Sequence, residues 1–93
     1  MGLINQWRKI RKHLMVAEQC IESKQWAHPY MLDYRAYLKV NELGLAWECL
    51  LGMLEEKHIQ LEHKRDFLEV MKAAAVEMGS KTHLEYLLSF NQD

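Results

Sequence analysis

The chain has 93 residues, of which 49% are hydrophobic and 27% are charged, and its formal net charge is −1. This length and balance predict one folded domain over residues 1–93 rather than two domains or a disordered segment. The near-zero charge argues against a nucleic-acid binder that depends on bulk positive charge. Cys20 and Cys49 lack the spacing of a redox or zinc motif, so we expect two reduced thiols and no disulfide.

The amino-terminal segment becomes charged at Arg8, before an apolar core typical of a signal peptide could form. Elsewhere no apolar run approaches the roughly 20 residues that a membrane span needs. We therefore expect a cytoplasmic protein with no membrane contact.

Apolar residues of the first segment recur at steps of three and four, which predicts an amphipathic helix with one buried stripe. The stripe consists of Leu3, Trp7, Ile10, Leu14, Ala17 and Ile21. A stripe of this length suits a bundle seam, and it also leaves a weak homodimer open. The basic residues beside it are expected to be a solvated face rather than a nucleic-acid patch; they are Arg8, Lys9, Arg11, Lys12 and His13.

Pro29 suits the first turn of a second helix, which we expect to end near Val40. This region is rich in aromatic residues. Tyr30, Tyr34 and Tyr37 share one helical face and are expected to point inward. Trp26, Tyr30 and Tyr37 are also candidate anchors of a protein interface, because Trp and Tyr dominate such contacts.

A third helix is predicted from about residue 42 to residue 56, and Gly44 stands inside its first turn. Glycine in a helix costs roughly 1 kcal/mol relative to alanine, so we expect another backbone to press against Gly44. Small and acidic residues form a ridge beside the apolar stripe of this helix: Gly44, Glu48, Gly52 and Glu55. The ridge fits either a partner surface or packing inside the bundle.

A fourth helix is predicted from Leu61 until Gly79, which suits a left-handed helix end. Thr82 and Glu85 have capping-box spacing and predict the start of a short last helix. No segment alternates as a strand does. The predicted fold is an all-α, single-domain bundle of four to five helices that needs no metal or cofactor.

Nothing in the sequence indicates an active site. His58 and His63 would point away from each other on a helix, and no second Glu-x-x-His pair accompanies Glu55 and His58. The serines at positions 23, 80 and 89 stand in no triad-like setting, and no glycine-rich phosphate loop occurs. We therefore expect a protein that is not an enzyme and has no metal site.

Residues 32–88 resemble a known family. The pattern runs Tyr-Leu-x-x-Asn-Glu-x-Gly-Leu-Ala-x-Glu-x-Leu over residues 37–50, followed by a short joint over residues 56–60. A further helix then closes with Glu77-Met78-Gly79. This arrangement resembles the small all-helical immunity proteins of bacterial contact-dependent and polymorphic toxin systems, the MafI-like and CdiI-like group.

The resemblance implies a non-enzymatic inhibitor that binds the toxic carboxy-terminal domain of a cognate effector, often a nuclease such as an EndoU-like ribonuclease. An acidic surface could meet the basic cleft of such an enzyme. The alternative is a small helical adaptor that binds a partner helix, with no toxin involved. The expected contact residues, assigned from their residue types, are Glu42, Gly44, Glu48, Gly52, Glu55, Trp26, Tyr30 and Tyr37.

Overall fold

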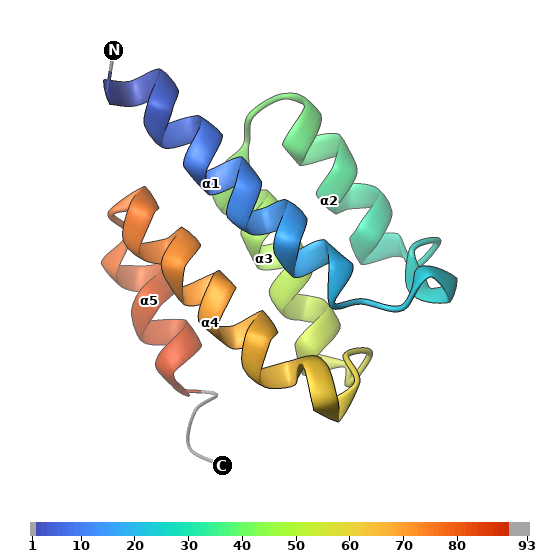
Figure 1. The fold of residues 1–93 in the computed structure, drawn as a ribbon. Coiled ribbons are helices and arrows are strands. Elements are labelled where there is room, and N and C mark those ends of the chain that lie inside the picture. Colours follow the sequence, from blue (N-terminus) through green and yellow to red (C-terminus); the bar gives the residue numbers. More distant parts are fainter. Residues whose placement is uncertain (1, 90–93) are drawn as a thin grey trace.

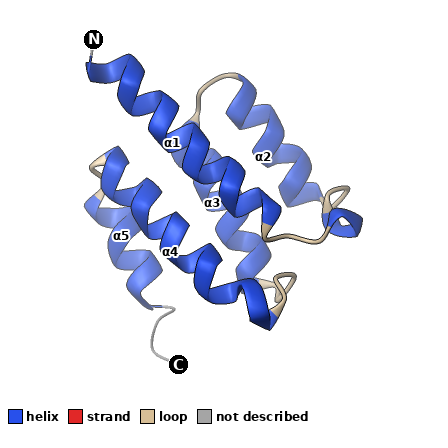
Figure 2. Cartoon of the chain, viewed as in Figure 1, coloured by secondary structure: helices blue, strands red, loops and turns tan. Residues whose placement is uncertain are grey.

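Five α-helices and one short 3₁₀ turn make up the fold in the computed structural model, which describes residues 2–89 and the side chains of residues 5–60 and 62–89 (Figures 1 and 2). Within this part of the chain the only strand-like feature is an isolated antiparallel bridge between Ile21 and Ile59. The prediction of an all-α bundle is confirmed. The elements are α1 (Gly2–Gln19), η1 (Ser23–Gln25), α2 (Pro29–Lys39), α3 (Leu43–Glu55), α4 (Leu61–Met78) and α5 (Lys81–Leu88).

The helices pack as two adjoining pairs. α1 and α4 lie side by side and antiparallel, while α2 and α3 form a hairpin behind and beside them (Figure 1). α3 contacts both α1 and α4, and α5 folds back along α4. The connection between α1 and α2 and the connection between α3 and α4 lie at the same end of the bundle, where the Ile21–Ile59 bridge joins them.

Three helices end in the same way. α2, α3 and α4 are each followed by a left-handed residue: Asn41 at φ 60°, Lys57 at φ 62° and Gly79 at φ 66°. In each case the N–H of that residue bonds to the carbonyl three positions back, and the next N–H bonds five positions back. This is the Schellman motif, which satisfies carbonyls that a helix end leaves open. The predicted role of Gly79 is confirmed, whereas Lys57 adopts a conformation that L side chains disfavour.

The core lies between α3 and its neighbours. Trp47 is fully buried, and its Nε1–H donates to the carbonyl oxygen of Met71 at 2.9 Å, which joins α3 to α4. Tyr34 is also fully buried, and its hydroxyl donates to the Glu18 carboxylate at 3.1 Å, which joins α2 to α1. Burial and the nearby Glu18 raise the pKa of Tyr34. The other large buried side chains are Leu14, Met31, Leu50, Leu51, Met53, Phe67, Met71 and Leu87.

Two local predictions were wrong. Trp7 is 39% exposed although it belongs to the predicted stripe, because it lines an open groove between α1, the start of α3 and the end of α4. The last helix begins two residues earlier than predicted: Ser80, not Thr82, is the N-cap, and its hydroxyl accepts the His83 N–H at 3.2 Å. The predicted stripe residues Ile10, Leu14, Ala17 and Ile21 are buried, and the Leu3 side chain lies outside the described part.

Candidate functional site

The two glycines of the α3 ridge have different surroundings. Gly52 is buried, and a Cβ there would lie 2.7 Å from Cε2 and 2.8 Å from Cδ2 of Tyr30. At Gly44 the nearest atom to such a Cβ is Nε2 of His83, at an ordinary contact distance of 3.6 Å. The expectation that a backbone presses on Gly44 was therefore wrong for the described part of the chain. Gly52 is the position where the bundle requires a missing side chain, and an aromatic ring fills the space.

The acidic residues of the ridge have partners on α5. Glu48 lies with Oε2 3.2 Å from Nε2 of His83, and the Tyr86 hydroxyl donates to Glu55 Oε2 at 3.0 Å. Both glutamates remain exposed. The ridge thus packs against α5 on one flank and against Tyr30 of α2 on the other. Of the two interpretations of the ridge, packing inside the bundle describes most of these contacts.

The aromatic residues before and within α2 are mostly engaged within the fold. The Trp26 Nε1–H donates to the Ile21 carbonyl at 3.2 Å, and the Arg35 guanidinium lies over the Trp26 ring at 5.2 Å from its centroid. Tyr37 is half-buried against the core. Tyr30 is 36% exposed: its ring packs inward against Gly52 of α3, while its hydroxyl bonds to the exposed Glu56 at the rim. Trp26 and Tyr30 lie before and at the start of α2, whereas Glu42 follows its end and donates its N–H to the Tyr37 carbonyl.

A different surface brings together two of the predicted contact residues. Glu42 and Gly44 line an open groove of about 320 Å³ at the amino-terminal end of α3. Trp7 and Ile10 of α1 and Met78 of α4 complete its apolar wall. The groove therefore places an exposed tryptophan next to a carboxylate.

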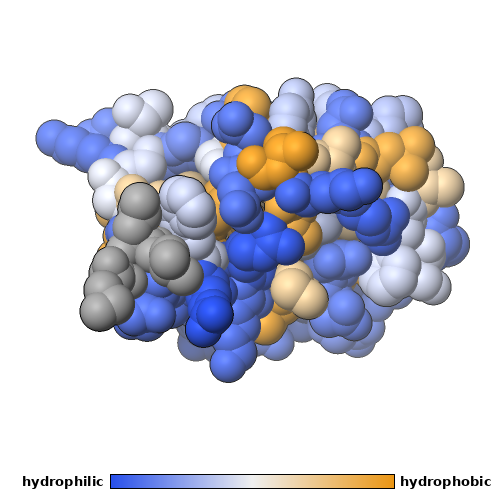
Figure 3. Space-filling model, turned by 90° about the horizontal axis from the view of Figure 1, so that it is seen from above, coloured by the Kyte–Doolittle hydropathy of each residue, from blue (hydrophilic) through white to orange (hydrophobic). Residues whose placement is uncertain are grey.

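Exposed apolar side chains extend this surface along the chain. Val40 is 65% exposed and Leu45 is 42% exposed, and they flank the groove residues 41–44 in sequence. Apolar patches interrupt a largely hydrophilic surface in the space-filling view (Figure 3).

Arg11, one of the basic residues of α1, holds this end of the bundle by donating to the Leu38 carbonyl and, at 2.8 Å, to Asn41 Oδ1. Arg11 thus has a structural role in place of the nucleic-acid contact that its charge could suggest.

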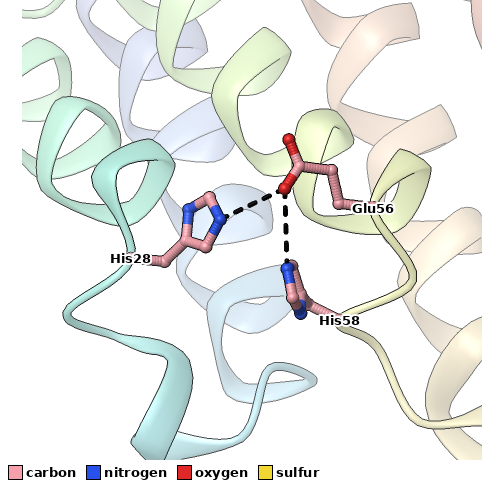
Figure 4. Close-up of side chains that lie close together, drawn as sticks. All are labelled: His28, Glu56 and His58. Carbon is pink, nitrogen blue, oxygen red and sulfur yellow. Dashed lines mark hydrogen bonds and ion pairs between the residues drawn. The ribbon is translucent and has the colours of Figure 1, made fainter.

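A second candidate site lies at the opposite end of α3. His28, Glu56 and His58 bring one potential ligand atom each to within 4.8 Å of one another (Figure 4). The Oε1 atom of Glu56 lies 3.2 Å from Nε2 of His28 and 3.6 Å from Nε2 of His58. Hydrogen bonds from Tyr30 and then His28 lower the pKa of Glu56, so its carboxylate remains ionised.

The sequence missed this cluster because its members come from two separate connections. His28 is the N-cap of α2, where its Nδ1 accepts the Tyr30 N–H at 3.0 Å. Glu56 and His58 flank the left-handed Lys57 after α3. Sequence spacing relates His58 only to its neighbours Glu55 and His63. The position of His28 directly before Pro29 signals an N-cap, but it does not signal the contact with residue 56.

A serine, a histidine and a glutamate also lie in a row at the start of α5. Ser80 Oγ contacts Nδ1 of His83, whose Nε2 faces Glu48. The same hydroxyl accepts the His83 backbone N–H as the N-cap of the helix. The ring of His83 packs edge-on against Trp47, with the centroids 4.8 Å apart. Ser80 and His83 are three residues apart and contact each other through both side chain and backbone, which is typical of helix capping. We therefore infer that the contacts among Ser80, His83 and Glu48 stabilise the start of α5.

The comparisons with known proteins are negative. No family model matches the chain, and neither the curated proteins nor the solved structures contain a significant match. Among the described residues, no helix combines the length and the apolar character that crossing a membrane requires.

Proposed function

We propose that this chain is an immunity protein that binds and neutralises a cognate bacterial toxin domain in the cytoplasm, without enzymatic activity of its own. The resemblance of residues 32–88 to MafI-like proteins supports this proposal. The favoured target is a nuclease, with an EndoU-like ribonuclease first, because such enzymes have basic clefts that hold RNA.

The observation that carries the proposal is the groove at the start of α3. Trp7 is 39% exposed there, and a tryptophan that water reaches on a folded monomer is the residue type most often found at the energetic centre of an interface. Val40 and Leu45 add exposed apolar area beside it.

The negative charge of Glu42 in the groove favours a partner with a basic surface. Glu42 lies in the groove, is exposed, and caps α3 without a side-chain hydrogen bond. Its carboxylate is thus available to a cation of the partner. Glu48 and Glu55 contribute negative potential from the same helix, but their contacts with α5 make them less suited to direct pairing. We therefore place the centre of the toxin contact at Trp7 and Glu42.

The experiment is co-expression with the product of the neighbouring gene, followed by purification and measurement of growth. We expect the wild-type chain to rescue growth and to form a stable complex. Trp7→Ala should weaken binding by about 30-fold or more, the effect of losing an interface hot spot of about 2 kcal/mol. Val76→Ala is the matched control, because Val76 is 58% exposed in a different groove between α1 and α4.

Glu42→Lys tests the electrostatic part separately. It should slow association at low salt, and the difference from wild type should shrink as salt is added. If the chain binds the neighbouring product but does not suppress its toxicity, the adaptor alternative replaces the immunity proposal. Equal losses for Trp7→Ala and Val76→Ala would show that the groove is not the contact surface.

A further inference from the structure

We propose that His28, Glu56 and His58 form a binding site for a divalent transition metal ion, with Zn²⁺ the best-matched ion. This site is independent of the groove and of the immunity role. Two imidazole nitrogens and one carboxylate oxygen are a donor set that zinc takes in proteins, with a fourth position left for water.

The distances between the donor atoms fit such an ion. Zinc binds these donors at about 2.0–2.2 Å, so neighbouring ligand atoms of a tetrahedral site lie about 3.3–3.5 Å apart. Oε1 of Glu56 lies 3.2 Å from Nε2 of His28 and 3.6 Å from Nε2 of His58, on either side of that length. The two rings lie with their centroids 4.9 Å apart, and both dashed contacts in Figure 4 converge on one carboxylate oxygen. Small ring rotations suffice to surround a metal ion.

The backbone holds the three residues in place. Left-handed Lys57 reverses the chain between Glu56 and His58, so that both side chains face the same side. A strained non-glycine residue of this kind is retained where the surrounding structure fixes it, often at a functional site. Next along the chain, Ile59 bridges to Ile21, which fixes the α3–α4 connection against the segment that leads to His28. The ligands are therefore set on two connections that are already joined.

The environment suits metal binding. The side chains of His28 and His58 are 20% and 27% exposed, and that of Glu56 is 45% exposed. An ion can therefore enter from solvent on the Glu56 side while the two rings stay supported by the protein. Tyr30, which hydrogen-bonds the same carboxylate, supplies the outer partner that metal-ligating carboxylates usually have.

Metal binding competes with two existing hydrogen bonds of His28. Nδ1 of His28 accepts the Tyr30 N–H, so the neutral ring carries its proton on Nε2 and donates it to Glu56. A ring that offers Nε2 to a metal carries its proton on Nδ1, and the Tyr30 N–H then loses its acceptor. The proton moves between the ring nitrogens through solvent, and the ring stays neutral. Losing an N-cap lowers the affinity by roughly tenfold.

One substitution separates the capping role of His28 from its role as a metal ligand. Asparagine is as good an N-cap as any residue, so His28→Asn should keep the start of α2 while removing one ligand. Glu56→Gln and His58→Gln remove the other two. His63→Gln is the matched control, since His63 is an exposed histidine that faces a carboxylate, Glu62, at 3.7 Å.

The experiment adds Zn²⁺ to the full chain and measures thermal unfolding and binding by calorimetry, with a chelator to reverse the effect. We expect one ion per chain and a raised unfolding temperature for wild type and His63→Gln. His28→Asn, Glu56→Gln and His58→Gln should each weaken binding by at least about tenfold, with unchanged circular dichroism before zinc is added. Failure of the wild-type chain to bind one ion, or binding by the three ligand variants as tight as that of the wild-type chain, would overturn the proposal.

Discussion

Gly52→Ala should destabilise the protein, although alanine is the better helix former. The added Cβ would lie 2.7 Å from Cε2 of Tyr30, whereas carbon atoms in contact are normally 3.5–4.0 Å apart, so the ring must retreat by about 1 Å. That movement opens the contact between α2 and α3 and lengthens the hydrogen bond from Tyr30 to Glu56. Overpacking of this kind costs about 1–3 kcal/mol, and the gain in helix propensity offsets about 1 kcal/mol of it.

We therefore expect a net loss of up to about 2 kcal/mol, which lowers the midpoint of thermal unfolding by up to about 15 °C for a domain of this size. Gly44→Ala is the control on the same helix: its Cβ meets only His83 at 3.6 Å, so it should stabilise slightly. Urea unfolding followed by circular dichroism gives both values. In a Tyr30→Ala background the sign at position 52 should reverse, because the ring is gone. If Gly52→Ala destabilises equally with and without Tyr30, the close approach of the ring is not the cause.

Three further predictions concern other positions. Lys57→Gly should stabilise the fold by about 0.5–1 kcal/mol in urea unfolding, because glycine adopts φ 62° without strain, and a loss of stability would contradict this. Burial raises the pKa of Cys49 to about 11, so its alkylation by iodoacetamide at pH 8 should be about 100-fold slower than that of a free thiol, and an equal rate would show that the thiol is not desolvated. Trp47→Phe removes the 2.9 Å hydrogen bond to the Met71 carbonyl and leaves space in the core, so the free energy of unfolding should fall by about 1–3 kcal/mol. Urea unfolding should show a lower midpoint and an unchanged dependence of this free energy on urea concentration.

The helices could be predicted from the sequence because their signals are local. Pro29 and Gly79 mark a helix start and a helix end through their own backbone preferences, and the spacing of apolar residues identifies most of the core. The start of α5 was misplaced because Ser80 and Thr82 are both good caps, and which of them caps depends on where Gly79 turns the chain. Periodicity also placed Trp7 in the core, but a groove between α1, α3 and α4 leaves its side chain 39% exposed, and sequence spacing does not reveal such a groove.

The sites were harder to predict because they depend on contacts between distant segments. Gly44 and Gly52 look equivalent in sequence, and only the position of Tyr30 distinguishes them. In the same way His28 meets Glu56 only after two connections join at one end of the bundle. The residue types of the predicted contact set were informative about chemistry. They could not show that Glu48 and Glu55 face α5, while Glu42 faces the groove.

The pairing of α1 with α4 has a consequence for how the chain is made. α2 and α3 are neighbours in sequence and can close on each other as soon as both have left the ribosome. α1 contacts α4 most extensively, so the apolar face of α1 stays uncovered until α4 has been synthesised. Synthesis of the intervening helices takes several seconds at roughly 5–20 residues per second. During that interval Ile10 and Leu14 have no α4 to cover them. The newly made protein therefore exposes the apolar face of its first helix until its fourth helix has emerged.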